Sequence, residues 1–166
     1  GIGTATTTLV GQSLGAGKLA QARHYTRLIL GVALGFSGFI SLWFVFAPDL
    51  LIEVFITDAM LDPEGLRMIS RKMLRLTAFY LMADALGAVI RGALNGAGDT
   101  FAVMCISSSM HILLLIGSVV LLKVLGLGAI AIWMFFVLFI LFFTCAFVFR
   151  YLQGHWTRRW QDRSAA

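Results

Sequence analysis

The sequence has 166 residues, of which 60% are hydrophobic and only 13% are charged. Soluble domains carry about 25% charged residues, so this composition excludes an ordinary soluble domain and indicates a membrane protein. The formal net charge of +5 does not require a nucleic-acid partner, and we expect none, because basic residues beside apolar spans commonly set membrane orientation.

The first expected element covers residues 1–14 and is predicted to be the end of a truncated helix. The chain starts with glycine inside an apolar segment, so we expect a fragment whose N-terminal part is missing. The following letters, GQSLGAGK, suggest a phosphate-binding loop, but the spacing fails. That loop needs glycine where Gln12 stands and a hydroxyl where Leu19 stands. We expect instead that Gly15 and Gly17 end a helix and that Lys18 begins a basic turn.

Four further helices are expected in chain order, at approximately 28–47, 66–95, 100–122 and 124–150. A helix needs about 20 apolar residues to cross the hydrocarbon of a bilayer. Inside lipid the backbone must satisfy its own hydrogen bonds, which favours helices. The predicted fold is therefore all-α: a polytopic membrane protein with about five transmembrane helices, the first one truncated.

The loops between these spans predict the orientation. Alternating sides place eight Lys and Arg residues on one side of the membrane and five on the other. Basic residues favour the cytoplasmic side, so the richer side, which includes the C-terminus, is predicted to be cytoplasmic. The tail HWTRRW, residues 155–160, combines tryptophan and arginine, which is typical of an interfacial anchor.

Pairs of small residues predict where helices pack closely. Gly31 and Gly35 form one such pair, and Gly92 and Gly96 form another. Glycines four residues apart let two helix backbones approach within a membrane. This signal concerns packing and does not distinguish a transporter from any other multi-span protein.

Patterns of catalytic or metal-binding residues are missing from the sequence. It has no Ser/His/Asp set, no His-Glu-x-x-His pattern and no cysteine cluster, and Cys105 and Cys145 lie inside apolar runs. An intramembrane hydrolase or a bound metal centre therefore has little support. We expect a protein that is not an enzyme and carries no cofactor.

Asp84 is the most informative residue, because it lies near the middle of the 66–95 span. A carboxylate there costs about 2.5–3.5 kcal/mol, so it usually faces a polar cavity or a partner. Thr77, Tyr80, Arg91 and Asn95 fall within about 40° of Asp84 on a helical wheel. This polar stripe predicts a wet path through the protein. The structural alternative is an ion pair or hydrogen-bond stripe between helices, with Arg91 reaching the interface.

The 100–122 span has a weaker polar face, which includes His111. Thr100, Ser107 and Ser118 share this face. His111 is a candidate proton carrier because imidazole changes charge near neutral pH. The alternative is a hydrogen-bonding group between helices.

Three stretches in order resemble the multidrug and toxic compound extrusion (MATE) transporters. VGQSLGAGK followed by QAR resembles the segment that leaves their eighth helix. MADALGAVIRGALNGAGDT resembles their tenth helix and the next turn, with Asp84 at the family's membrane-embedded acid. KVLGLGAIAIW resembles the junction of the last two helices. Asn95 departs from the commoner arginine, which leaves no support for a charge role at that position.

The resemblance implies a fold and a function for residues 1–166. The family has twelve helices in two lobes, so this chain would be a partial C-terminal lobe, helices eight to twelve, with the N-terminal lobe absent. It implies a secondary antiporter of the bacterial inner membrane that exports cationic, amphipathic compounds. Inward Na⁺ or H⁺ flow would drive it, with the ion and the substrate competing for Asp84. Membrane lipids and the missing lobe would be its partners.

Two other functions stay open at this point. One is a flippase of the same superfamily that moves a lipid-linked oligosaccharide, although such proteins often have more charged cavities. The other is a non-transporting membrane scaffold or subunit, for which an apolar residue at position 84 would affect stability alone.

Overall fold

The computed structural model describes residues 1–55, 62–157 and 160, and these residues contain helices and no strand. The helices are α1 (Ile2–Gly15), α2 (Leu19–Phe46), α3 (Pro48–Phe55), α4 (Pro63–Gly96), α5 (Thr100–Val119), a π-helical turn η1 (Val120–Val124) and α6 (Ala129–Leu152). By length and composition, α2, α4, α5 with η1, and α6 are each able to cross a membrane. This confirms the predicted all-α polytopic bundle.

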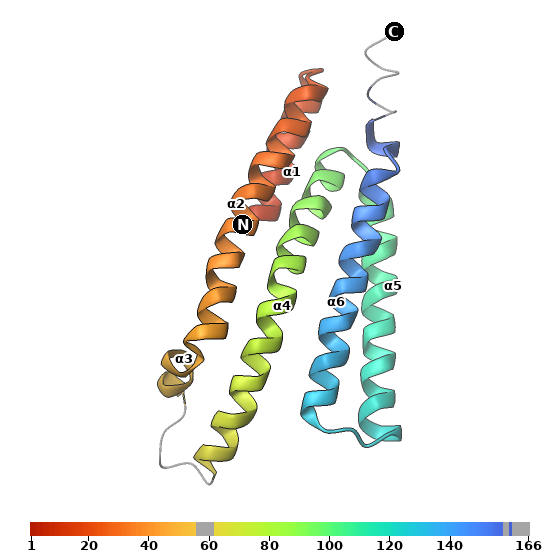
Figure 1. The fold of residues 1–166 in the computed structure, drawn as a ribbon. Helices are drawn as coiled ribbons and strands as arrows, with labels where there is room; N and C mark the ends of the chain where they lie inside the picture. The colour runs from red at the N-terminus through yellow and green to blue at the C-terminus, as the bar shows by residue number, and fades with distance from the viewer. Residues whose placement is uncertain (56–61, 158–159, 161–166) are drawn as a thin grey trace.

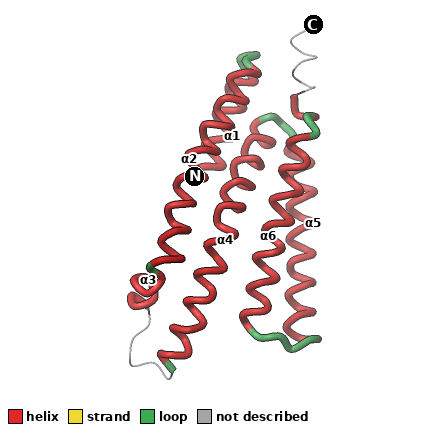
Figure 2. Tube along the Cα trace, viewed as in Figure 1, coloured by secondary structure: helices red, strands yellow, loops and turns green. Residues whose placement is uncertain are grey.

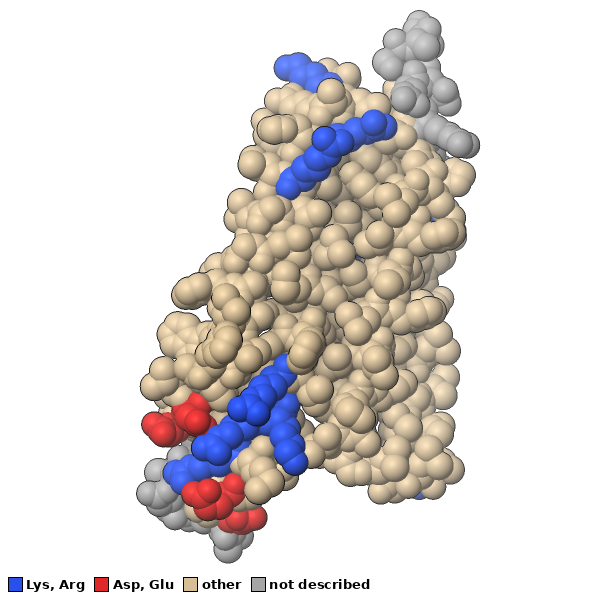
Figure 3. Space-filling view, viewed as in Figure 1, with Lys and Arg blue, Asp and Glu red and all other residues tan. Residues whose placement is uncertain are grey.

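Helix α4 stands at the centre of the bundle, with α1 and α2 on one side and α5 and α6 on the other (Figure 1). The α1–α2 turn, the α4–α5 turn and the end of α6 lie at one end. Helix α3 and the α5–α6 connection lie at the opposite end (Figure 2). The long helices therefore alternate in direction, and in Figure 3 an uncharged belt separates two charged ends. In that view the α3 end carries both signs of charge, whereas the α1–α2 end shows Lys and Arg alone.

Several helix boundaries differ from the expected ranges. Helix α2 begins at Leu19 instead of residue 28, because its first turns continue through the charged residues that precede the apolar span. The loss of charge marks the membrane edge and not the start of the helix. Helix α6 begins at Ala129 instead of residue 124, because Gly126 takes a φ of 61°, a left-handed conformation that suits glycine. Helix α3 was not predicted.

The glycine-rich turn at residues 15–18 ends a helix, as predicted. Helix α1 stops at Gly15, and Gly17 takes a φ of 73°. The Lys18 N–H then donates to the Ser13 carbonyl at 2.8 Å, which satisfies a carbonyl at the helix end. A helix precedes this turn, so it lacks the strand that a phosphate-binding loop requires.

Helices α1 and α4 touch through their backbones. A Cβ atom added at Gly96 would lie 2.5 Å from the Thr7 carbonyl oxygen. A Cβ atom added at Gly92 would overlap the Gly3 carbonyl oxygen. The predicted close packing of Gly92 and Gly96 is confirmed. An added Cβ at Gly31 or Gly35 would meet no atom within 4 Å, so this pair makes no helix contact among the described residues.

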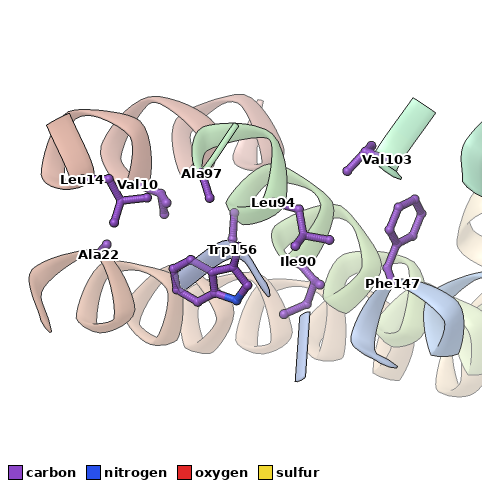
Figure 4. Packing of buried hydrophobic residues seen from close by; sticks show 10 residues of the cluster. Val10, Leu14, Ala22, Ile90, Leu94, Ala97, Val103, Phe147 and Trp156 are labelled. Carbon is purple, nitrogen blue, oxygen red and sulfur yellow. The ribbon is translucent and has the colours of Figure 1, made fainter. Parts of the chain in front are cut away.

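The hydrophobic core lies toward the end of the bundle where α1 and α2 meet. It joins buried side chains from five helices and the segment after α6. These are Val10, Leu14, Ala22, Ile90, Ala93, Leu94, Ala97, Val103, Phe147 and Trp156. Figure 4 shows Trp156 among the side chains of α1, α2 and α4.

The segment after α6 is fastened to the bundle. Trp156 is 4% exposed, stacks on Tyr151 with ring centroids 5.0 Å apart, and donates from Nε1 to the Tyr151 carbonyl. Trp160 donates from Nε1 to the carbonyl of Ala97 at 3.1 Å. The expectation of an interfacial anchor is therefore wrong for Trp156, because its indole packs into the protein and not against lipid.

An ion pair fixes the α4–α5 turn to α6 at the same end. The Arg150 guanidinium donates to both carboxylate oxygens of Asp99, from Nε at 2.8 Å and from Nη2 at 3.0 Å. Both side chains are largely shielded from solvent, with relative exposures of 27% and 14%. Two-point contacts of this kind fix orientation as well as distance.

Candidate functional site

The first half of α4 borders a cavity of about 520 Å³, here called the aromatic cavity. It lies between α2, α3, α4 and α6. Its lining residues are Phe44, Leu51, Ile52, Phe55, Ser70, Met73, Leu74, Thr77, Tyr80 and Trp133. Aromatic rings and apolar side chains form most of this wall, and no charged residue takes part, so it suits an apolar or aromatic guest.

Polar groups of the aromatic cavity come from α4. The Tyr80 ring meets Phe136 edge to face at 5.7 Å, and Tyr80 and Thr77 interact through their side chains. The Thr77 hydroxyl also donates to the Met73 carbonyl at 2.8 Å. Across the cavity, the buried Nε1 of Trp133 has no acceptor among the described residues. This N–H is buried within the protein and does not face the cavity.

Asp84 lines a second cavity of about 430 Å³, here called the Asp84 cavity. It lies between α1, α2 and α4. Its other lining residues are Gly1, Ile2, Gly3, Ala33, Phe36, Ser37, Ile40, Leu81, Ala85 and Ala88. Asp84 is its sole charged side chain. Among the residues that the structure describes, the Asp84 carboxylate has no hydrogen-bond donor and no ion-pair partner.

The two cavities lie next to each other along α4. Tyr80 is one helical turn from Asp84, and the Asp84 charge acts on the Tyr80 hydroxyl. Thr77 and Tyr80 line the aromatic cavity and Asp84 lines the other one, so the single polar path suggested by the helical wheel stays a prediction. A charge that enters the Asp84 cavity would be felt at the edge of the aromatic cavity.

Arg91 is separated from this group although it shares the same face of the wheel. Its guanidinium carbon lies 5.7 Å from the ring centre of Phe143 and 5.6 Å from that of Phe147, both on α6. A guanidinium stacks favourably on aromatic faces, which explains why the side chain turns toward α6. Arg91 therefore makes no ion pair with Asp84, and it lines neither cavity.

Asn95 and His111 also line neither cavity. Asn95 lies one turn beyond Arg91 on α4, near the α4–α5 turn. His111 lies on α5, where its Nδ1 is 2.6 Å from the Ser107 carbonyl and its ring meets Phe143 edge to face at 5.7 Å. Ser107 is on the same helix, so its contact with His111 is not the hydrogen bond between helices that was the alternative for His111, and any role in proton transfer stays a prediction.

Three hydroxyl groups that sequence reasoning did not single out hold α4 to its neighbours. Thr144 of α6 donates to the Ala83 carbonyl at 3.0 Å, and Ser41 of α2 donates to the Ala78 carbonyl at 3.0 Å. Thr7 of α1 donates to the Gly92 carbonyl at 3.1 Å. Serine and threonine inside apolar spans commonly bond across helices, so this signal was present in the sequence.

Comparison with known proteins decides the family. The family model described as MatE matches residues 1–120. This chain belongs to the MatE family. A curated relative from Deinococcus radiodurans, named "Probable multidrug resistance protein NorM", is 33% identical to this MatE chain over 138 residues.

The match to that relative covers 80% of the MatE chain but 30% of the relative's own length. The chain thus spans about a third of the protein that it resembles. No solved structure matches the chain significantly. Family membership and the four apolar helices together make it a multi-pass membrane protein.

Proposed function

We propose that this chain forms part of a secondary antiporter that exports organic cations and drug-like compounds. MatE membership supports a transporter and not an enzyme, and the relative's name supports multidrug resistance as the process. The observation that carries the proposal is the unpaired Asp84 carboxylate, which lies in a membrane-spanning helix and lines a cavity. An ionisable group at that depth is costly, so it is usually retained for function.

The aromatic cavity supports a cationic, amphipathic substrate. Tyr80 and Trp133 line the cavity with aromatic rings, and such rings attract a cation through their faces. The apolar remainder of the wall suits the hydrophobic part of such a molecule. The Asp84 charge one turn away would attract the same substrate when ionised and release it when neutralised.

The coupling follows from competition for one carboxylate. Inward Na⁺ would pair with Asp84, or H⁺ would neutralise it, and either event would weaken the attraction for a cationic substrate. Helix α4 would then bend near Gly87, because Gly92 is held against the α1 backbone, and the transporter would alternate between inward and outward states. This proposal places the protein in the bacterial inner membrane, with the Lys- and Arg-rich end in the cytoplasm.

The test is ion-driven efflux by the protein with Asp84→Asn. We expect ion-driven efflux of ethidium to be abolished, because an uncharged amide neither takes up a proton nor neutralises Na⁺. Efflux from proteoliposomes under a sodium gradient and under a proton gradient, measured separately, identifies the coupling ion. Asp84→Glu should keep part of the activity, because it keeps the carboxylate.

A matched control is Glu53→Gln, which removes a carboxylate from exposed α3 without touching either cavity. It should leave efflux unchanged. Normal ion-driven efflux in a folded Asp84→Asn protein would refute the proposal. A loss of stability alone at position 84 would point to a scaffold instead.

A further inference from the structure

A pocket of about 300 Å³ lies at the basic end of the bundle, away from both cavities described above. Helix α2, the end of α6 and the segment after α6 form most of its wall. The lining residues are Arg23, Thr26, Arg27, Leu30, Ile90, Tyr151, Leu152, Gly154, Trp156 and Thr157. We call this the basic pocket.

Two arginines give the basic pocket its charge. Arg23 and Arg27 lie one turn apart on the same face of α2, and both side chains are exposed. No carboxylate pairs with either of them among the described residues. The nearby acid, Asp99, is already held by Arg150. The pocket therefore presents two uncompensated guanidinium groups, which are suited to bind phosphate oxygens.

Hydroxyl groups stand beside the two arginines. Tyr151 interacts with Thr26 through its side chain and lies within the electrostatic reach of Arg23 and Arg27. Thr157 contributes a further hydroxyl, which donates to the Gly154 carbonyl at 2.8 Å. The Trp156 ring stacks on Tyr151 and forms a rigid wall, so the pocket has a fixed shape.

Apolar side chains also border the basic pocket. Leu152, which lines the pocket, is 74% exposed, and Leu30 of α2 also lines it. The uncharged stretch of α2 begins directly after Arg27. The basic pocket therefore lies where the headgroup layer meets the hydrocarbon.

We propose that the basic pocket binds the phosphate of an anionic phospholipid, with the acyl chains lying along Leu30 and Leu152. The arginine pair recognises the phosphate, and these apolar side chains accept the tails. Basic pockets between membrane helices are suited to this class of ligand. A free phosphate ion shares the headgroup chemistry but would leave the apolar border unused.

The test uses the purified protein in detergent and native mass spectrometry to measure bound lipid. Dioctanoyl-phosphatidylglycerol is the probe, and dioctanoyl-phosphatidylcholine is its zwitterionic counterpart. We expect one tightly bound phosphatidylglycerol molecule per protein and weaker binding of phosphatidylcholine. The double variant R23Q/R27Q should weaken phosphatidylglycerol binding by about 10- to 30-fold, because each basic residue near an anionic headgroup contributes to affinity.

Two further variants separate a built pocket from general attraction. R23K/R27K keeps both charges but loses the guanidinium geometry, so its binding should fall between that of the wild type and that of R23Q/R27Q. K72Q/R75Q removes two exposed charges from the opposite end of the bundle and should change nothing. Both arginines of the pocket are exposed, so the glutamine pair should fold normally, and size-exclusion chromatography checks this.

Three results would overturn the proposal. The first is unchanged phosphatidylglycerol binding in folded R23Q/R27Q. The second is an equal loss in K72Q/R75Q, which would indicate nonspecific attraction. The third is displacement of the lipid by inorganic phosphate at equal concentration, which would assign the pocket to the free ion.

Discussion

The two halves of helix α4 differ in what surrounds them. In the second half, residues 87–96, most side chains are buried and glycines bring the α1 backbone into contact. In the first half, residues 63–86, Ala78 is the one buried residue, and the helix borders both cavities. We call these the packed half and the open half.

This difference indicates that one part of α4 stabilises the bundle, whereas the other part carries the residues of the proposed site. The packed half carries small residues whose value lies in contact with neighbouring backbones. The open half carries Thr77, Tyr80 and Asp84, of which Asp84 is exposed and the other two are partly buried. Substitutions in the packed half should therefore change stability strongly, whereas those bordering the open half should change it little.

The largest effect is expected for Gly92→Val. The added side chain would collide with the backbone of Gly3, which cannot rotate away, so α1 must shift. Overpacking of this kind should destabilise the protein by about 3 kcal/mol. Thermal unfolding in detergent, followed by size-exclusion chromatography with fluorescence detection, measures the fall in Tm.

Gly31→Val is the matched control, because a side chain at Gly31 meets open space. Its stability should stay within about 0.5 kcal/mol of wild type. Equal effects at Gly31 and Gly92 would remove the distinction between packed and open surfaces of the bundle.

An intermediate effect is expected for Arg150→Gln, which breaks the ion pair at the packed end. Asp99 would lose two charged donors while its side chain is 14% exposed. Allowing for solvent screening, we expect a loss of about 1–2 kcal/mol in the free energy of unfolding. The same thermal assay measures it.

Arg71→Gln provides the comparison for that ion pair. Arg71 pairs with Asp49 at 2.6 Å, but both side chains are about half exposed, at 45% and 50%. Such pairs are worth about 0–1 kcal/mol. A larger loss at Arg71 than at Arg150 would contradict the assignment of stability to the packed end.

The smallest effect is expected for Thr144→Val, where the two halves meet. Valine keeps the shape of threonine beside Gly87 but removes the hydrogen bond to the Ala83 carbonyl. Interhelical hydrogen bonds in membrane proteins average about 0.6 kcal/mol, so Tm should fall only slightly. A fall as large as that of Gly92→Val would show that the open half is also structural.

Much of the fold follows from local signals in the sequence. Charge-free stretches predict the spans, Gly15 and Gly17 predict a helix end, and Gly92 and Gly96 predict a close contact. The start of α2 was missed because a helix continues past the membrane edge, where apolar periodicity ends. Helix α3 is too short to give a transmembrane signal.

The candidate site was predictable only as far as one helix defines it. A helical wheel places Thr77, Tyr80 and Asp84 near one another on α4, but the neighbouring helices divide them between two cavities, which no wheel of a single helix can show. The direction of the Arg91 side chain depends on its contact with Phe143, which is distant in sequence. A helical wheel of α4 alone cannot predict that contact. The coupling role of Asp84 stays a prediction until efflux is measured.

The contact between α1 and α4 has a mechanical consequence. A rod that is held more tightly along one part of its length tilts most at the end farthest from that part. Helix α4 is fixed along residues 87–96, and beyond them hydroxyls of Thr144 and Ser41 hold it at Ala83 and Ala78. Asp84 lies near the fixed part and Thr77 farther along, so a small tilt at the acid becomes a larger sweep at the aromatic wall.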